Sequence, residues 1–533
     1  MILDFITYKD KVMGCWAGKN IGGVLGFPYE CLRQWNEIDF YTQDLSAGPP
    51  PNDDLDLQIV WLAAVERFGR FVNASILGEY WLSYIMPNWV EYGTGKSNMR
   101  TGLQPPLSGY VDNQYRDSCG CFIRSEIWAC LAPGRPDIAT RYAYEDGIVD
   151  HSNEGIYGEL LCAAMESAAF VESDKRKLID IGLSYIPVES AVARCVRTAI
   201  SCYDEHMPLK EARARIHNEA PGTFGGVRMK TSDIPTDNGT LAIGTPGFDC
   251  PENVGFIIAG WLYGEDDFGK SLCMAVACGE DTDCTAATLG AIMGIIAGAS
   301  KLPEKWTAPL NDQIETLCID KTTPNGIWVP KTVTDLTDRV LRTTPLFLGS
   351  EVCDILSGEG YTVRCLDGDD LYCPQDDYLY RHETGESPRF FSARELKKLG
   401  PYVVKYDFPT HFVLLDYMGE PYFRHDEIRK IRIVIRNNVL MNQQMWCRVR
   451  LYMPEGINVL GGVEYLLSLN TRYGDSGEVV IHIDPTSFEG GKLELLIDIA
   501  MEGRHTSTPI KALLLRDPSS GSYQPNEINN AHK

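Results

Sequence analysis

Two short acidic motifs, more than 200 residues apart, carry the clearest potential for chemistry in this chain. The first is Asn52-Asp53-Asp54, and the second is the aspartate pair within residues 278–284, Cys-Gly-Glu-Asp-Thr-Asp-Cys. Each stands directly before an apolar stretch with helical period. A helix N-terminus holds carboxylates in fixed positions through its free N–H groups and partial positive charge, so both motifs could coordinate a hard cation. Ordinary N-capping is the alternative for either motif alone.

The two motifs are more informative together than apart. Four carboxylates gathered at one point repel one another by several kcal/mol unless a cation lies between them. If the two helix ends meet, we therefore expect them to meet around metal. Oxygen ligands favour Mg²⁺, with Mn²⁺ and Ca²⁺ as alternatives, over zinc. The four carboxylates are those of Asp53, Asp54, Asp281 and Asp283.

The 17 cysteines give a weaker signal. The usual zinc spacings, Cys-x-x-Cys and His-x-x-x-His, are both missing. Free buried thiols are the expected state in a chain of cytosolic character. A soft-metal site is the alternative at two groups, Cys119 with Cys121, and Cys273 with Cys278 and Cys284.

A third segment supplies a further acid. Residues 14–26 are rich in glycine and are followed by a loop that ends at Glu30. A dinucleotide-binding loop needs a particular glycine spacing after a strand, and neither the spacing nor the strand is indicated here. We therefore interpret these glycines as positions of close packing.

Two regions of different pattern must position these motifs. Residues 1–345 contain long apolar stretches of helical period, which predicts an all-α bundle. Residues 346–516 alternate with period two between turn residues, which predicts an all-β sandwich, and residues 517–533 are expected to form a flexible tail. The clearest predicted helices cover residues 55–71, 153–171, 188–205, 250–263 and 285–300, and the clearest strands cover residues 430–435, 447–452, 478–484 and 492–499.

Composition argues against several classes of function. The formal net charge of −24 over 533 residues disfavours a protein that binds nucleic acid or anionic lipid, because both need clustered Lys and Arg. A small-molecule or glycan substrate, or a cation, fits better. The first residues lack the apolar core of a signal peptide, and the run 286–299 is too short to span a membrane. We therefore expect a cytoplasmic protein, and the sequence leaves its oligomeric state open.

Several blocks, in the same order along the chain, resemble the ADP-ribosylglycohydrolase family, which includes the enzyme that removes ADP-ribose from dinitrogenase reductase. The family's Thr-Asp-Asp and Gly-Gly-Asp-Thr-Asp-Thr motifs are similar to the two acidic motifs described above. Its glycine-rich block, its Pro-x-Glu, its central Gly-Ser-Ala-Met-Arg block and its Thr-His helix also have counterparts. The matching segments are Gly18–Gly22, Pro28–Glu30, Asn52–Asp54, Asp117–Arg124, Asp150–His151 and Gly279–Cys284.

The resemblance implies an orthogonal all-α bundle with a binuclear Mg²⁺ site. It assigns metal binding to the four aspartates, with Asn52 and Cys284 at positions where typical members have threonine, and a thiol is a poor magnesium ligand. It makes Glu30 a contact of metal or reactive water. The candidate catalytic carboxylates are Glu30, Asp54 and Asp283, and the candidate substrate-binding residues are Ser118, Cys119, Gly120 and His151.

The expected activity is metal-dependent hydrolysis of an N- or O-glycosidic bond at the anomeric carbon of a ribosyl-like sugar, ADP-ribosyl or related. Typical members of the family lack an appended β-domain, so a glycosidase or nucleosidase acting on a carbohydrate without ADP-ribose is an alternative. A metal- or sugar-binding protein without turnover is a second alternative. Retention of Glu30 and all four aspartates argues against that last reading, because repelling carboxylates cost stability unless they are used.

Overall fold

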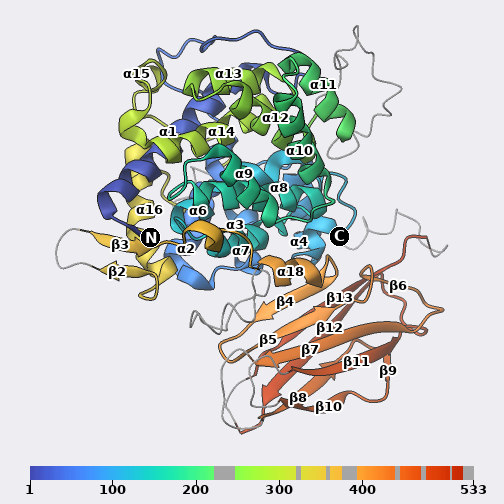
Figure 1. Ribbon diagram of the computed structural model, residues 1–533. Helices are drawn as coiled ribbons and strands as arrows, with labels where there is room; N and C mark the ends of the chain where they lie inside the picture. Colours follow the sequence, from blue (N-terminus) through green and yellow to red (C-terminus); the bar gives the residue numbers. More distant parts are fainter. Residues whose placement is uncertain are drawn as a thin grey trace. The chain divides into compact units, whose positions relative to one another are not determined.

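The computed structural model describes residues 1–220, 247–319, 326–355, 360–374, 393–437, 445–469, 476–503 and 507–519. Over these ranges the chain forms two compact units, which divide between residues 398 and 399. The first unit is helical, and the second is built from strands (Figure 1). Both predicted classes of structure are therefore confirmed. The expected tail lies outside the described residues from residue 520 onward.

The helical unit follows the predicted order of elements. Four of the five clearest predicted helices correspond to α8, α10, α12 and α14 within three residues at each end, and the fifth to α2 with the short helices on either side of it. The α-helices are α1 (Phe5–Gly26), α2 (Asp56–Phe68), α3 (Ala74–Tyr84), α4 (Val90–Thr101), α5 (Leu107–Tyr110), α6 (Glu126–Leu131), α7 (Pro136–Gly147), α8 (Asn153–Ala168), α9 (Lys175–Ser184), α10 (Ala191–Asp204), α11 (Leu209–Glu219), α12 (Cys250–Tyr263), α13 (Phe268–Ala277), α14 (Thr282–Ala297), α15 (Glu304–Thr307), α16 (Val333–Leu348) and α18 (Ala393–Leu399).

Short 3₁₀ segments and one small sheet complete this unit. The sheet has the order β1–β3–β2 and joins the N-terminus to residues more than 350 positions later. Its strands are β1 (Ile2–Leu3), β2 (Cys353–Ile355) and β3 (Tyr361–Arg364). The 3₁₀ segments are η1 (Phe27–Tyr29), η2 (Asp53–Leu55), η3 (Gly69–Phe71), η4 (Cys119–Arg124), η6 (Ala299–Lys301), η7 (Ala308–Leu310) and η8 (Gly368–Leu371).

Residues 14–26 of α1 pack antiparallel against residues 282–294 of α14, and glycine makes this close approach possible. A Cβ atom placed on Gly18 would lie 2.0 Å from the Gly290 carbonyl oxygen, and one placed on Gly290 would lie 2.1 Å from the Gly18 oxygen. The same close approach recurs between Gly14 and Gly294. The α1 glycines that face α14 are therefore close-packing positions, as predicted, whereas Gly23 has room for a Cβ atom. This packing brings the N-terminus of α14 to the C-terminus of α1.

The buried middle of the bundle is made by helices that are apolar on nearly every side. In α8, α12 and α14 almost all side chains are buried, as expected for helices that contact other helices all round. In the described ranges, no helix is both long and apolar enough to cross a membrane.

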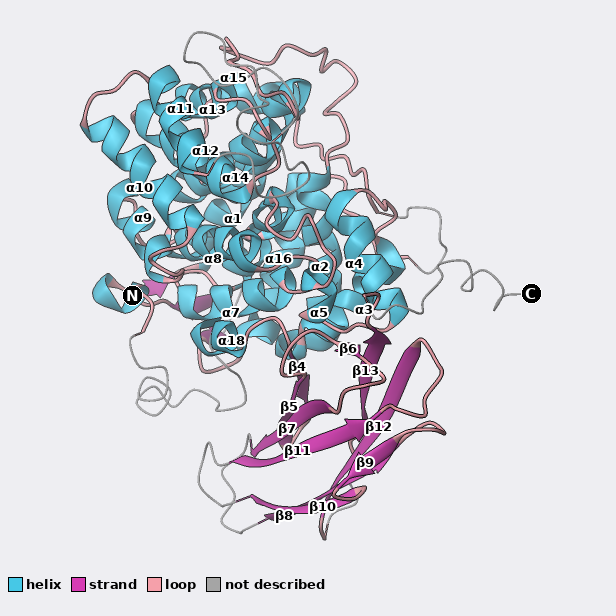
Figure 2. Cartoon of the chain, turned by 90° about the vertical axis from the view of Figure 1, so that its right-hand side faces the viewer, coloured by secondary structure: helices cyan, strands magenta, loops and turns pink. Residues whose placement is uncertain are grey.

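The second unit contains two five-stranded sheets, shown in magenta in Figure 2. Their orders are β10–β8–β12–β13–β6 and β4–β5–β7–β11–β9, and every pairing is antiparallel except β13 with β6. In β8, Cys447, Val449 and Leu451 are buried while Trp446 and Tyr452 are exposed, so the period-two pattern marks one buried face. The strands are β4 (Val403–Asp407), β5 (His411–Asp416), β6 (Tyr422–Phe423), β7 (Arg429–Asn437), β8 (Met445–Tyr452), β9 (Asn458–Leu460), β10 (Glu464–Leu469), β11 (Ser476–Asp484), β12 (Lys492–Met501) and β13 (Ile510–Arg516).

Candidate metal centre

The packing of α1 against α14 brings the second acidic motif next to the Glu30 loop. The Thr282 hydroxyl donates a 2.8 Å hydrogen bond to the Gly26 carbonyl oxygen at the end of α1. A backbone bridge then joins Leu32 to Glu280, with the Glu280 N–H 2.9 Å from the Leu32 oxygen. These contacts fix the loop that carries Glu30 against the N-terminus of α14.

Asn52 connects the first acidic motif to the second. Its Oδ1 atom accepts a 2.7 Å hydrogen bond from the Asp54 N–H, which caps η2 as predicted for this position. Its Nδ2 atom donates a 3.0 Å hydrogen bond to Asp283 Oδ2. The two helix ends therefore do meet, and one amide side chain bridges them.

The side chains that meet there form three overlapping groups of potential ligands. Within each group the donor atoms all lie within 4.8 Å of one another. Asp281, Asp283 and Cys284 each belong to two groups, so neighbouring ion positions would share ligands. The groups are Glu30 with Asp281 and Asp283, Asp54 with Asp283 and Cys284, and Cys119 with Asp281 and Cys284.

Several of these carboxylate oxygens are buried without a hydrogen-bond partner. Both oxygens of Asp54 are in this state, as are Oδ1 of Asp281 and Oδ1 of Asp283. The three residues are only 2–4% exposed. Asp281 stands at the N-cap of α14, yet its side chain makes no capping hydrogen bond. Capping does not account for these aspartates, whereas bound cations would satisfy them, so the residues present fit a divalent metal centre.

Asp53 lies slightly apart from the three groups. It is partly buried, and its Oδ2 atom accepts a 3.0 Å hydrogen bond from the Tyr92 hydroxyl. Its burial raises the pKa of its carboxyl group. Of the four aspartates expected to bind metal, Asp53 therefore stands outside the three groups of potential ligands and is held by Tyr92.

Burial and mutual repulsion disfavour charge on these acids. Burial, and then the nearby charges of Asp281 and Asp53, raise the pKa of Glu30 to about 8. Burial also raises the pKa of Asp54 and of Asp283 well above the ordinary range, despite the Lys19 ammonium near Asp54. Lys19 is fully buried and lies 2.8 Å from Glu126 Oε1. Divalent cations would reverse these shifts by stabilising the ionised carboxylates.

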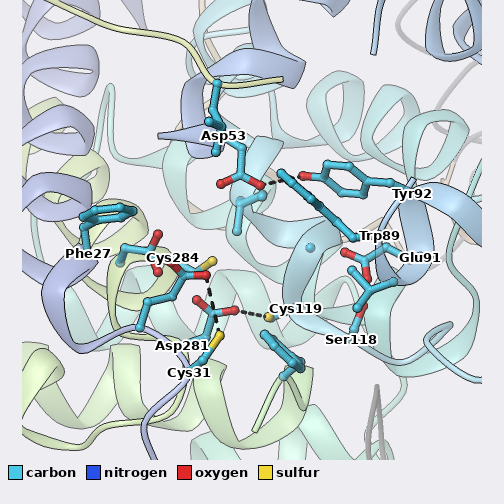
Figure 3. Close-up of a pocket in the computed structure, with 17 residues that line it drawn as sticks. Phe27, Cys31, Asp53, Trp89, Glu91, Tyr92, Ser118, Cys119, Asp281 and Cys284 are labelled. Atoms are coloured by element: carbon cyan, nitrogen blue, oxygen red, sulfur yellow. Dashed lines mark hydrogen bonds between the residues drawn. The ribbon is translucent and has the colours of Figure 1, made fainter. Parts of the chain in front are cut away.

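Glu30, Asp53, Asp281 and Asp283 line an open cavity of about 370 Å³ (Figure 3), and Asp54 is not among the residues that line it. Ser118, Cys119 and Gly120, which the resemblance assigns to substrate binding, also line it. Sequence reasoning missed much of the remaining wall, because most of it comes from apolar or aromatic residues outside the acidic motifs. The residues that it missed are Phe27, Cys31, Trp89, Val90, Glu91, Tyr92, Ile123, Phe248 and Leu317.

His151 lies behind the cavity wall. Its Nε2 atom is 2.9 Å from the Ser118 hydroxyl, within hydrogen-bond distance. Its Nδ1 atom is 2.9 Å from Asp150 Oδ1, but the angle between them is not that of a hydrogen bond. Arg124 holds Asp150 with a 2.6 Å contact, and both side chains are fully buried. Among the predicted substrate-binding residues, His151 is therefore placed to orient Ser118 and does not itself line the cavity.

Glu91 is the missed residue with the clearest chemistry. It lies in the first turn of α4, it is 5% exposed, and its burial raises the pKa of its carboxyl group to about 7. Gly120 makes room for it, because a Cβ atom at that position would lie 2.0 Å from Glu91 Oε1. Glu91 lies outside every helix and motif predicted from the sequence, so no local pattern marked it.

Comparison with known proteins gives one family. The search of the curated proteins found no relative of this chain. A solved structure described as an "ADP-ribosylglycohydrolase-related protein complex" aligns with 64% of this chain and 98% of its own, at 15% sequence identity and a TM-score of 0.39. The family model described as ADP-ribosylglycohydrolase matches residues 5–340, which is more than half of the sequence. The chain therefore belongs to the ADP-ribosylglycohydrolase family.

Proposed function

We propose that the protein is a divalent-metal-dependent glycohydrolase that cleaves an N- or O-glycosidic bond at the anomeric carbon of a ribosyl-like sugar. The observation that carries this proposal is the set of buried, unpartnered carboxylate oxygens of Asp54, Asp281 and Asp283 beside an open cavity. Membership of a glycohydrolase family supports the type of bond.

The chain's acids would hold the ions from two sides. Asp53 and Asp54 contribute from η2, while Asp281 and Asp283 contribute from the start of α14. Bound Mg²⁺ would supply positive charge that offsets these carboxylates and binds the vicinal hydroxyls of a furanose ring. Asn52 keeps the two sides in register through its hydrogen bonds to the Asp54 N–H and the Asp283 carboxylate.

Glu30 is the proposed general base. It is partly exposed in the cavity, where its carboxylate can take a proton from the water that attacks the anomeric carbon. The bond from the anomeric carbon to the leaving atom breaks as the bond to the water oxygen forms. The transition state has oxocarbenium character, as in other glycosidic cleavages.

Glu91 is the proposed general acid. Burial raises the pKa of Glu91 to about 7, which favours the protonated carboxyl group far more than in an exposed glutamate. Such a group can protonate the departing oxygen or nitrogen as the glycosidic bond breaks. The cavity would thus contain two glutamates in different roles, in addition to its aspartates.

The cavity wall favours a neutral glycoside or nucleoside as a second candidate substrate. Among the described residues that line it, none is Lys, Arg or His, although a pyrophosphate is commonly bound by such cations. The exposed rings of Phe27 and Trp89 at the cavity instead offer apolar faces to a base or sugar (Figure 3). Hydrolysis of a carbohydrate without ADP-ribose is therefore a specific alternative within the same chemistry.

The test combines metal binding with a substrate screen. Mg²⁺, Mn²⁺ or Ca²⁺ is added to the metal-free protein while unfolding is monitored, and release of free sugar is then measured from ADP-ribosyl peptides, ADP-ribose, nucleosides and pentofuranosides. We expect metal to stabilise the protein and to be required for turnover. Stabilisation without turnover on any substrate would favour a binding protein, and turnover only on the nucleosides or pentofuranosides would select the second candidate.

A further inference from the structure

Two thiols from distant parts of the chain meet at the metal centre. Cys119 opens η4, and Cys284 lies in the first turn of α14. Their Sγ atoms and a carboxylate oxygen of Asp281 all lie within 4.8 Å of one another. We propose that Cys119, Asp281 and Cys284 hold a thiophilic divalent transition-metal ion, of the class of Zn²⁺, Co²⁺ or Fe²⁺, beside an oxygen-ligated ion such as Mg²⁺. This inference rests on the proposed function and specifies the chemistry of one of its metal positions.

The contacts around Asp281 show how the ion would be held. The Cys119 thiol donates a hydrogen bond to Asp281 Oδ2 over 2.7 Å, as Figure 3 shows. Asp281 Oδ1 is buried without a partner, so this carboxylate has one oxygen toward the thiol and another available to a second ion. Cys119 is 2% exposed and Cys284 is 8% exposed, so both thiols are buried together with the aspartates.

The geometry requires little movement. Donor atoms around a tetrahedral ion with bonds of about 2.0–2.3 Å lie about 3.3–3.8 Å apart. The observed separations are 2.7 Å between Cys119 Sγ and Asp281 Oδ2 and at most 4.8 Å within the group. Shifts of about 1 Å would therefore produce such a site. Binding would release the two thiol protons to solvent. One of these is the proton in the hydrogen bond from Cys119 to Asp281, and the ion would take its place between the two side chains.

Neighbouring acids supply the remaining ligands. Cys284 also belongs to a group with Asp54 and Asp283, which both have buried oxygens without partners. Asp281 and Asp283 in turn form a group with Glu30, which contains only oxygen donors. The site thus has a sulfur-containing half and an oxygen half that share Asp281 and Asp283. Thiolates bind Zn²⁺ and other transition ions far better than Mg²⁺, so the two halves select different metals.

Cobalt spectroscopy tests the assignment without any turnover assay. Co²⁺ is titrated into the metal-free protein under reducing, oxygen-free conditions, and the thiolate-to-cobalt charge-transfer absorption is recorded. We expect a strong band that falls to about half in Cys119→Ser and Cys284→Thr and vanishes in the double variant, because each thiolate contributes separately. The control variant Cys121→Ser should keep the full band, since this thiol contacts Glu159.

A measurement on the unaltered chain covers the case in which a variant does not fold. X-ray absorption of the Zn²⁺-loaded protein should show sulfur neighbours at about 2.3 Å. The inference would be overturned by oxygen and nitrogen neighbours alone, by an unchanged cobalt band in the double variant, or by a Cys119–Cys284 disulfide that persists in the presence of reductant. A protein that is stabilised by Mg²⁺ or Mn²⁺ but shows no sulfur ligation would keep the proposed function. A protein that binds no divalent ion would lose both.

Discussion

Replacing Asp54 by asparagine removes one negative charge from the metal centre while keeping the shape of the side chain. Both oxygens of Asp54 lack hydrogen-bond partners, so Asp54→Asn breaks no hydrogen bond of this carboxylate. The Asn52 cap is also kept, because it uses the backbone N–H of residue 54. In the metal-free protein we therefore expect this variant to be more stable than the unaltered chain.

The size of the effect follows from the distances. Carboxylate oxygens of Asp54 and Asp283 lie within 4.8 Å of each other, and two unit charges at that distance repel by about 3.5 kcal/mol at an effective dielectric constant of ~20. Attraction to the Lys19 ammonium offsets part of this repulsion. At a pH above the raised pKa values of both acids, where both are ionised, we expect a net gain of about 2 kcal/mol. In a unit of about 390 residues the unfolding entropy is about 0.8 kcal/mol per kelvin, so Tm should rise by about 2–3 °C.

The assay is thermal unfolding with and without Mg²⁺ or Mn²⁺. Metal at about 100 times its Kd should stabilise the unaltered chain by about 2.7 kcal/mol, whereas Asp54→Asn should gain little. The order of stability of the two proteins should therefore reverse when metal is added. Asp56→Asn is the matched control, because Asp56 accepts hydrogen bonds from the N–H groups of Leu317 and Cys318. This variant should be less stable than the unaltered chain both with and without metal. A less stable metal-free Asp54→Asn, or an equal response of both proteins to metal, would refute the reasoning.

Three further predictions concern the acid, the helix packing and the pH dependence. Glu91→Gln should lower kcat/KM by about 100-fold while leaving the metal-induced shift in Tm intact. The loss of kcat/KM should be smaller for substrates with good leaving groups, which need less protonation. An equal loss for all leaving groups would contradict the role of Glu91 as general acid. Gly18→Ala should destabilise the protein by at least about 3 kcal/mol in denaturant unfolding, because the added Cβ atom would lie 2.0 Å from the Gly290 oxygen. Gly23→Ala on the same helix is the control. Its Cβ atom would meet its nearest neighbour at 3.4 Å, so stability should change little. Glu30 has a pKa raised from about 4.5 to about 8, so the folded metal-free protein binds more protons than the unfolded chain between these two pH values. The contribution of Glu30 to stability should be fully present below about pH 4.5 and should be lost as pH rises through about 8. A Tm that rises with pH across this window would contradict the assignment.

The sequence was most informative where local pattern and packing agree. The two acidic motifs could be placed at helix entrances because capping residues and apolar period are local signals. The glycines of α1 indicated close packing, and that packing brings Glu30 to the start of α14. In this region the folded chain therefore brings the acids of the two motifs together.

Other features depended on tertiary contacts that no local pattern encodes. Cys119 and Cys284 are 165 positions apart in the printed sequence, and their spacing gave no sign that both would contact one aspartate. Trp89 and Glu91 sit at the start of α4, which was not among the helices predicted from the sequence, and only the folded chain places them in the cavity. His151 was assigned to the substrate pocket by resemblance, whereas its imidazole contacts Ser118 from behind the wall. Pairing of β1 with β3 likewise joins segments that carry no mutual signal.

The most direct test of the central claim is the release of free sugar by chelator-treated protein, before and after Mg²⁺ is restored, with metal content checked by elemental analysis. The proposed function predicts that hydrolysis of a ribosyl substrate stops when the ions held by Asp53, Asp54, Asp281 and Asp283 are removed, and that it returns when Mg²⁺ is added. Undiminished hydrolysis by a protein shown to contain no divalent metal would contradict it.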